Sequence, residues 1–235
     1  MSAFLLLFSA CQPQGQASGN QDLSRADIDT LSSLASVWHG GEAVALIRHT
    51  ERCDRSPSTC VEGDSGITEA GQAAARDLGA GFRTLSLDAA IVYSSPERRA
   101  TQTAEAAFGT GVEVRDWLRE CRSGIRPNLF ENKVPGVNLI LLTHSSCMEQ
   151  FDSPAGELQQ DLDYMDPDTY GAVIFLRLDT ARRKVSVLGY LKAADWAPFL
   201  ARLAMLPEVS VSDGRAAEPG RLARASVVRR AARSR

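Results

Sequence analysis

Two histidines and several arginines stand in three polar segments that are far apart in the sequence. The first reads Arg48-His49-Thr50-Glu51-Arg52, the second begins at Ser94 and includes Arg99, and the third reads Thr143-His144-Ser145-Ser146. Arginine forms planar, bidentate hydrogen bonds to phosphate oxygens, and a histidine ring can take up and release a phosphoryl group. Because phosphoryl transfer depends mainly on positioning and charge stabilisation, these residue types predict a phosphate-handling site.

Each polar segment follows a short apolar run without clean alternation. The runs are Ala43 to Ile47, Ala89 to Tyr93 and Val137 to Leu142. Such runs are typical of strands buried on both faces of a parallel sheet. Ligands of open α/β sheets bind beyond the carboxyl ends of the strands, so we expect the three segments to converge on one crevice.

Helical segments are predicted between these strands. One covers Glu69 to Leu78, with Thr68 as its N-cap and Gly79 as its stop, and another covers Pro96 to Phe108, with Ser95 as its cap. The second helix places Arg99 one turn from its start, facing the same crevice. Strand-helix-strand order predicts an α/β fold with a mostly parallel sheet between two layers of helices.

The last part of the sequence predicts a different local structure. Ala172 to Asp179 and Lys184 to Leu191 are expected to form a hairpin at or near the sheet edge, followed by a helix from Ala193 to Ala204.

The segments LIRHTER, YSSPERRATQTA and LLTHSS, in this order, resemble the motifs of the phosphoglycerate-mutase-like histidine phosphatases. The resemblance implies a three-layer α/β/α fold and a phosphomonoester hydrolase whose nucleophile is His49. It also implies that Arg48, Arg99 and His144 clamp the phosphoryl group, with Arg52 and Arg55 as further phosphate contacts. The alternative for the last two is a surface loop paired with Glu51, Asp54 or Glu62.

The leaving oxygen needs a proton, usually from a carboxylic acid. Glu120 in WLREC stands where members of this family carry an L-x-E acid, and Glu51 is the substitute candidate. His144 is followed by Ser145 and not by aspartate, which argues against phytase activity.

The segment RHTERCDRS, with Cys60, Gly66 to Thr68 and the TH-x-x-C pattern that ends at Cys147, is similar to the lipopolysaccharide core heptose(II)-phosphate phosphatases. This resemblance implies a phosphorylated sugar of the cell envelope, borne on a small molecule or glycolipid, as the substrate. Thr50 replaces the glycine that usually follows the histidine, which raises the question of how that loop is held.

The two ends of the chain differ in composition from the residues between them. Residues 1–22 contain an apolar run from Ala3 to Phe8 and then Ser9-Ala10-Cys11, which resembles a bacterial lipoprotein signal with Cys11 as the lipidated residue and a possible membrane anchor. An apolar N-terminus without an export role is the alternative. Residues 23–208 form the predicted catalytic domain, and the arginine-rich residues 209–235 form a predicted disordered tail. The acidic remainder argues against a nucleic-acid partner.

Four cysteines remain in the body: Cys53, Cys60, Cys121 and Cys147. An even number suits disulfides in an oxidising compartment such as the periplasm, although four cysteines allow three pairings. Metal binding is the competing hypothesis, and it is weaker because no C-x-x-C pair occurs and the histidines are only His39, His49 and His144. We therefore predict no metal and no organic cofactor, and a structural role for His39.

Two other functions are compatible with the same residues. The protein could be a phosphatase or mutase of soluble phosphometabolites or phosphoproteins, or a phosphate-binding domain without activity. The export-like leader and the cysteines favour an envelope substrate over the first, and the complete set of Arg48, His49, Arg99 and His144 disfavours the second.

Overall fold

The computed structural model describes residues 21–85, 90–119, 125–151 and 169–206. Within these ranges the chain forms a six-stranded sheet in the order β3-β2-β4-β1-β5-β6. Its strands are β1 (Ala43–Arg48), β2 (Ala90–Ser94), β3 (Glu113–Val114), β4 (Asn138–Thr143), β5 (Val173–Asp179) and β6 (Lys184–Leu191). Neighbours from β3 to β1 pair in parallel, whereas β1-β5 and β5-β6 are antiparallel. The predicted mostly parallel sheet and its terminal hairpin are confirmed.

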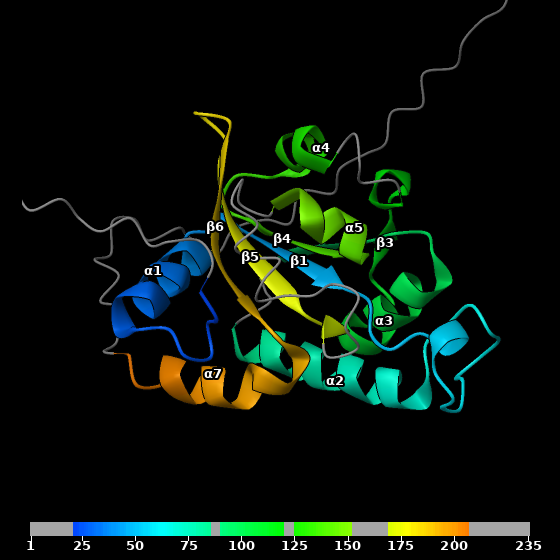
Figure 1. Cartoon of the computed structure of the whole chain (residues 1–235). Helices are drawn as coiled ribbons and strands as arrows, with labels where there is room; N and C mark the ends of the chain where they lie inside the picture. The colour runs from blue at the N-terminus through cyan, green and yellow to red at the C-terminus, as the bar shows by residue number, and fades with distance from the viewer. Residues whose placement is uncertain (1–20, 86–89, 120–124, 152–168, 207–235) are drawn as a thin grey trace, which may run out of the picture.

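Helices cover both faces of this sheet (Figure 1). The helices that pack into one core are α1 (Ile28–His39), α2 (Glu69–Thr84), α3 (Arg98–Phe108) and α7 (Trp196–Leu203). Those that pack into the core on the other face are α4 (Ile125–Asn132) and α5 (Ser145–Met148). The fold is therefore a three-layer α/β/α arrangement, as predicted.

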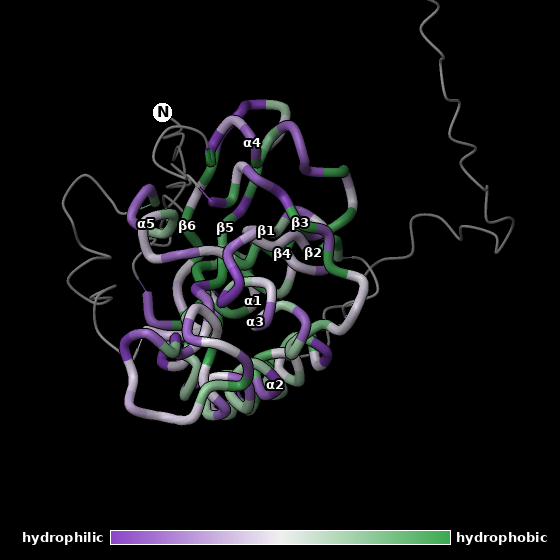
Figure 2. The backbone as a smooth tube through the Cα atoms, turned by 90° about the vertical axis from the view of Figure 1, so that its right-hand side faces the viewer, coloured by the Kyte–Doolittle hydropathy of each residue, from purple (hydrophilic) through white to green (hydrophobic). Residues whose placement is uncertain are grey.

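The apolar composition of β1 follows from this layering. All six of its residues are buried. Ala43, Ala45 and Ile47 belong to the core beneath α1 and α2, while Val44 and Leu46 belong to the core beneath α4 and α5. Figure 2 shows hydrophobic colours along the strands at the centre of the molecule.

Helix α2 begins where the sequence predicted and ends later. The hydroxyl of Thr68 accepts a hydrogen bond from the backbone N–H of Gly71, which confirms the N-cap. The predicted stop at Gly79 is wrong, because the helix continues to Thr84. A Cβ atom at Gly79 would lie 2.1 Å from the carbonyl oxygen of Ala107. This glycine therefore allows α2 and α3 to approach closely and does not end the helix.

Helix α3 begins two residues later than predicted, at Arg98, and Ser95 is not its cap. The backbone of Glu97 is extended, with ψ of 130°, so the chain enters the helix only after that residue. The Ser95 hydroxyl accepts a 3.3 Å hydrogen bond from the N–H of Glu97 and also contacts the ring of His144. Arg99 is therefore the second residue of the helix.

A helix follows the hairpin, as predicted, but it starts later than Ala193. A 3-10 turn at Ala193–Asp195 precedes α7, which begins at Trp196. The predicted leader, Cys11 and the basic tail lie outside the described residues. Among the residues that are described, no helix is both long and apolar enough to cross a membrane.

A disulfide joins Cys53 and Cys60, two of the four candidate cysteines. It closes the loop that follows β1, and backbone bridges join Cys60 to Thr68 and Arg52 to Ile67. Cys147 is disulfide-bonded as well. Cys121 lies outside the described residues.

Candidate active site

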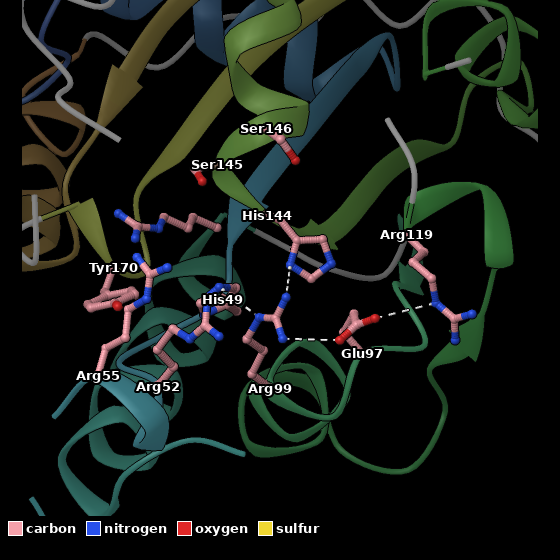
Figure 3. Close-up of a pocket in the computed structure, with 11 residues that line it drawn as sticks. His49, Arg52, Arg55, Glu97, Arg99, Arg119, His144, Ser145, Ser146 and Tyr170 are labelled. Carbon is pink, nitrogen blue, oxygen red and sulfur yellow. Dashed lines mark hydrogen bonds and ion pairs between the residues drawn. The ribbon is translucent and has the colours of Figure 1, made fainter. Parts of the chain in front are cut away.

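The carboxyl ends of β1, β2 and β4 meet at one pocket of about 240 Å³ (Figure 3). It brings together residues from all three polar segments of the sequence. Its lining consists of Arg48, His49, Arg52, Arg55, Glu97, Arg99, Arg119, His144, Ser145, Ser146 and Tyr170. The expected convergence therefore occurs, because parallel strands end at the same edge of the sheet.

The ring of His49 is oriented by its own loop. Its Nδ1 lies 2.8 Å from the carbonyl oxygen of Thr50. A carbonyl oxygen only accepts hydrogen bonds, so Nδ1 carries the proton and Nε2 of the neutral ring carries the lone pair. The Nε–H of Arg99 donates to this Nε2 over 3.2 Å, so the lone pair lies on the arginine side of the ring.

The same arginine also contacts the second histidine. An Nη2–H of Arg99 donates to Nδ1 of His144 over 3.3 Å, while Nε2 of His144 lies 2.9 Å from the hydroxyl of Ser95. Because arginine can only donate, Nδ1 is the acceptor and Nε2 carries the proton. The two histidine rings are 5.6 Å apart, and Arg99 bridges them (Figure 3).

Both histidines are held in the neutral form. Burial lowers the pKa of His49 well below 6.5, against the raising effect of the Thr50 hydrogen bond. The positive charges of Arg99 and Arg48, and of His144 whenever it is protonated, lower it further. Burial and the positive charge of Arg99 lower the pKa of His144 to about 4. A neutral imidazole is the form that can attack phosphorus, and the lowered pKa favours this form of His49 at neutral pH.

Arg48 is buried immediately before His49, with 5% of its surface exposed. Its guanidinium lies 4.1 Å from the centre of the Tyr170 ring and donates to the hydroxyl of Thr169. Stacking of a guanidinium on an aromatic face restricts its orientation. Arg48 is therefore held in place next to His49.

The loop after His49 is held by Thr50, which stands where a glycine is usual. Its backbone N–H donates to the hydroxyl of Thr103 on α3 over 3.1 Å, and the two hydroxyls are also 3.1 Å apart. Among the described residues only Arg183 is a non-glycine residue with a positive φ, so the Thr50 backbone needs no glycine. The loop is thus anchored to α3 by a pair of threonines.

Arg52 and Arg55 both line the pocket, and Arg52 also forms the predicted alternative pairing with Asp54. Glu97 accepts from Arg99 over 3.1 Å and lies 3.4 Å from Nε of Arg119. Figure 3 shows Arg55 at one end of the lining and Arg119 at the other, with Arg99 between them.

Of the two candidate acids, only Glu51 lies among the described residues. Glu120 lies outside the described residues. Glu51 is absent from the pocket lining, and its carboxylate instead accepts hydrogen bonds from Ser56 over 3.0 Å and Thr68 over 2.5 Å. His39 ends α1, is exposed and also lies away from the pocket.

Sequence reasoning missed several pocket residues. Glu97 could have been found, because it stands inside the SSPER segment directly after β2, and Arg119 is the middle residue of the L-x-E pattern. Tyr170 follows no motif and reaches the pocket only because of the turn before β5.

In the described part of the chain no group of three or more histidine, cysteine, aspartate or glutamate residues could hold a metal ion.

A neutral histidine in an arginine-rich pocket, beyond the carboxyl ends of a parallel α/β sheet, defines a class of phosphate-handling enzymes. Residues 44–162 match the family model described as the histidine phosphatase superfamily, branch 1. The chain belongs to this superfamily, and it is a phosphatase.

The chain is also similar to proteins of known name. The chain is 34% identical over 152 residues to a lipopolysaccharide core heptose(II)-phosphate phosphatase of Salmonella arizonae, covering 63% of this chain and 73% of that protein. It is 31% identical over 169 residues to the protein of the same name in Salmonella schwarzengrund, covering 71% and 82%.

Solved structures of similar proteins include the protein histidine phosphatase SixA complexed with tungstate, with a TM-score of 0.47 and 18% identity over 65% of this chain and 98% of that one. Another is the alpha-ribazole phosphatase from Shigella flexneri, with a TM-score of 0.41 and 14% identity over 62% and 94%.

Proposed function

We propose that this protein hydrolyses phosphomonoesters through a phosphohistidine on His49, and that its substrate is a sugar phosphate of the bacterial envelope such as lipopolysaccharide core heptose phosphate. One observation carries the mechanism: the Nδ1–H of His49 donates to the carbonyl of Thr50, which leaves the lone pair on Nε2. The names of the relatives support the substrate class.

In the first step, Nε2 of His49 attacks phosphorus, and the bond from phosphorus to the ester oxygen breaks. Arg48, Arg52, Arg99 and His144 stabilise the negative charge on the equatorial oxygens. Arg99 donates to His49 in the resting site, so its donors must turn to the phosphoryl oxygens when substrate binds. We propose that Glu120 protonates the departing oxygen.

In the second step, water attacks the phosphohistidine and gives a proton to the Glu120 carboxylate left by the first step, the bond from nitrogen to phosphorus breaks, and inorganic phosphate leaves. The His49 ring returns to its neutral form with its lone pair on Nε2. Glu97 positions the cationic side chains in both steps, because its two oxygens lie against Arg99 and Arg119.

The experiment measures phosphate release from p-nitrophenyl phosphate, phosphorylated lipopolysaccharide core and soluble sugar phosphates. His49→Ala is compared with His39→Ala, which replaces an exposed histidine away from the pocket. We expect His49→Ala to abolish release and His39→Ala to retain it. Phosphate release by His49→Ala at the wild-type rate would refute the mechanism, and a preference for soluble phosphates over the lipopolysaccharide core would refute the substrate.

The proposed site of action is the periplasm, with anchoring through a lipidated Cys11. The leader-like sequence, the Cys53–Cys60 disulfide and the relatives named for lipopolysaccharide support this location. Fractionation of cells that express the full chain should place it in the envelope, and Cys11→Ala should release it from the membrane fraction. Recovery of the wild-type chain in the cytosol would contradict the proposal.

A further inference from the structure

The pocket has more positive charge than a phosphoryl group requires. Among the residues that the structure describes, five arginines line it against one carboxylate, Glu97. Three of the arginines have acidic partners, since Arg52 pairs with Asp54 and Glu97 is shared by Arg99 over 3.1 Å and Arg119 over 3.4 Å. Arg48 and Arg99 flank the nucleophile and match the two negative charges of a phosphate dianion. Arg55 then remains, and no acidic partner for it lies among the described residues.

Arg55 differs from the other four arginines in its contacts. No ion pair or hydrogen bond joins its guanidinium to any described residue. Figure 3 draws it at the end of the pocket lining opposite Arg119. Its side chain is exposed, so a ligand could reach it without displacing an internal partner.

The backbone that carries Arg55 is held firmly. The Cys53–Cys60 disulfide closes the loop on either side of it. The N–H of Cys53 donates to the carbonyl of Gly66 over 3.0 Å, and the N–H of Ser56 donates back to Cys53 over 3.2 Å. A loop tied in this way presents its arginine at a fixed place, which reduces the entropy lost when a ligand binds.

We propose that Arg55 binds a second anionic group of the substrate, a carboxylate or another phosphate, next to the phosphoryl group that is hydrolysed. This inference rests on the proposed phosphatase function of the same pocket. It assigns Arg55 a neighbouring oxyanion and not the phosphoryl group itself.

The size of the pocket agrees with this assignment. Its volume of about 240 Å³ is below the roughly 300–1,000 Å³ of most small-molecule sites. It can hold the phosphorylated end of a substrate, while the remaining groups lie at the open rim. An exposed arginine at that rim selects substrates by charge next to the phosphate.

The experiment compares kcat/KM for two matched pairs of phosphomonoesters. In the first pair, 3-phosphoglycerate carries a carboxylate where glycerol 3-phosphate carries a hydroxymethyl group. In the second pair, fructose 1,6-bisphosphate carries a second phosphate that fructose 6-phosphate lacks. The pair with the larger ratio identifies the chemical source of the second oxyanion.

We expect the wild-type enzyme to prefer the doubly anionic member of at least one pair by about tenfold, the size of one hydrogen bond between charged groups. Arg55→Gln should reduce that ratio to near one. Arg98→Gln should keep it, because Arg98 pairs with Glu62 and is absent from the pocket lining. The ratio should also fall as salt is added, because exposed charges are screened.

Either of two results would overturn the inference: a wild-type ratio near one for both pairs, or an equal loss on both members in Arg55→Gln. Calorimetric titration of the same compounds into His49→Ala measures the preference without turnover. A charge preference in binding with no hydrolysis by the wild-type enzyme would reject the proposed function and retain the second anion site.

Discussion

Arg99 is the side chain on which the proposed site is centred. Its guanidinium donates to Nε2 of His49, to Nδ1 of His144 and to a carboxylate oxygen of Glu97. A planar guanidinium can hold three partners in one fixed geometry, whereas a lysine ammonium cannot. We therefore expect Arg99 to contribute to the transition state more than to folding.

Arg99→Ala should lower kcat on the order of 10²-fold or more, the usual effect of removing one donor to a developing charge. Its neighbour on α3 provides the control, since Arg98 points to Glu62 and Arg98→Ala should stay near the wild-type rate. Phosphate release and far-ultraviolet circular dichroism of both variants test this. An Arg99→Ala enzyme with nearly full kcat would show that the phosphoryl group is held elsewhere.

The histidine pKa values predict how stability depends on pH. The folded-state pKa of His49 lies well below 6.5, and that of His144 is about 4, so the unfolded chain binds protons first as the solution is acidified. Their contribution is present above pH 6.5 and is lost as pH falls toward 4, by up to about 1.4 kcal/mol per histidine and pH unit.

The melting temperature should therefore fall between pH 6.5 and 4, and it should fall less steeply in His144→Gln. Thermal melts of both proteins across this range provide the measurement. Parallel curves for the two proteins would mean that His144 is not held neutral in the folded state.

At the scale of elements, the close approach of α2 and α3 bears on the position of the loop that follows β1. Gly79 allows this approach, because a Cβ atom there would lie 2.1 Å from the backbone oxygen of Ala107. Thr103 on α3 in turn holds the loop of the proposed nucleophile through Thr50. Packing between two helices is thus connected to the orientation of His49.

Gly79→Ala should destabilise the fold by about 1–3 kcal/mol through overpacking, although alanine favours helices over glycine by about 1 kcal/mol. Gly111→Ala is the control, since a Cβ atom at Gly111 has no neighbour within 4 Å. Urea unfolding of both variants measures the free energies. A Gly79→Ala protein more stable than wild type would show that the helices separate at little cost.

At the scale of the whole molecule, one aromatic cluster joins segments that are far apart in the sequence. Phe82 of α2 is fully buried, and its ring centre lies 5.7 Å from Trp38, 6.1 Å from Phe175 and 4.9 Å from Trp196. These rings belong to α1, β5 and α7. One residue therefore connects the first helix, the sheet and the closing helix.

Phe82→Ala should cost about 3–5 kcal/mol, because it leaves a cavity where four segments meet. Phe82→Leu should cost less, since most of the volume is kept. Calorimetric melts should show a single transition at a lower temperature for both variants. A loss below about 1 kcal/mol in Phe82→Ala would indicate that the cluster collapses around the missing ring.

Some of the predictions failed because of neighbours distant in the sequence. Gly79 resembles a helix stop locally, and only the backbone of Ala107 explains why it lies inside a helix. Ser95 resembles an N-cap, but it bonds the ring of His144 and the helix starts after Glu97. In both cases a tertiary contact outweighed the local preference.

The sequence by itself determined where the buried strands lie along the chain, that the sheet is mostly parallel, and that Arg48, His49, Arg99 and His144 converge. These follow from patterns along the chain, because apolar runs must be buried and parallel strands end at one edge. Only the tertiary structure decided which nitrogen of His49 carries the lone pair, that Tyr170 supports Arg48, and that Glu97 lies between two arginines. Those features depend on distances between side chains from separate segments, and the order of residues does not specify such distances.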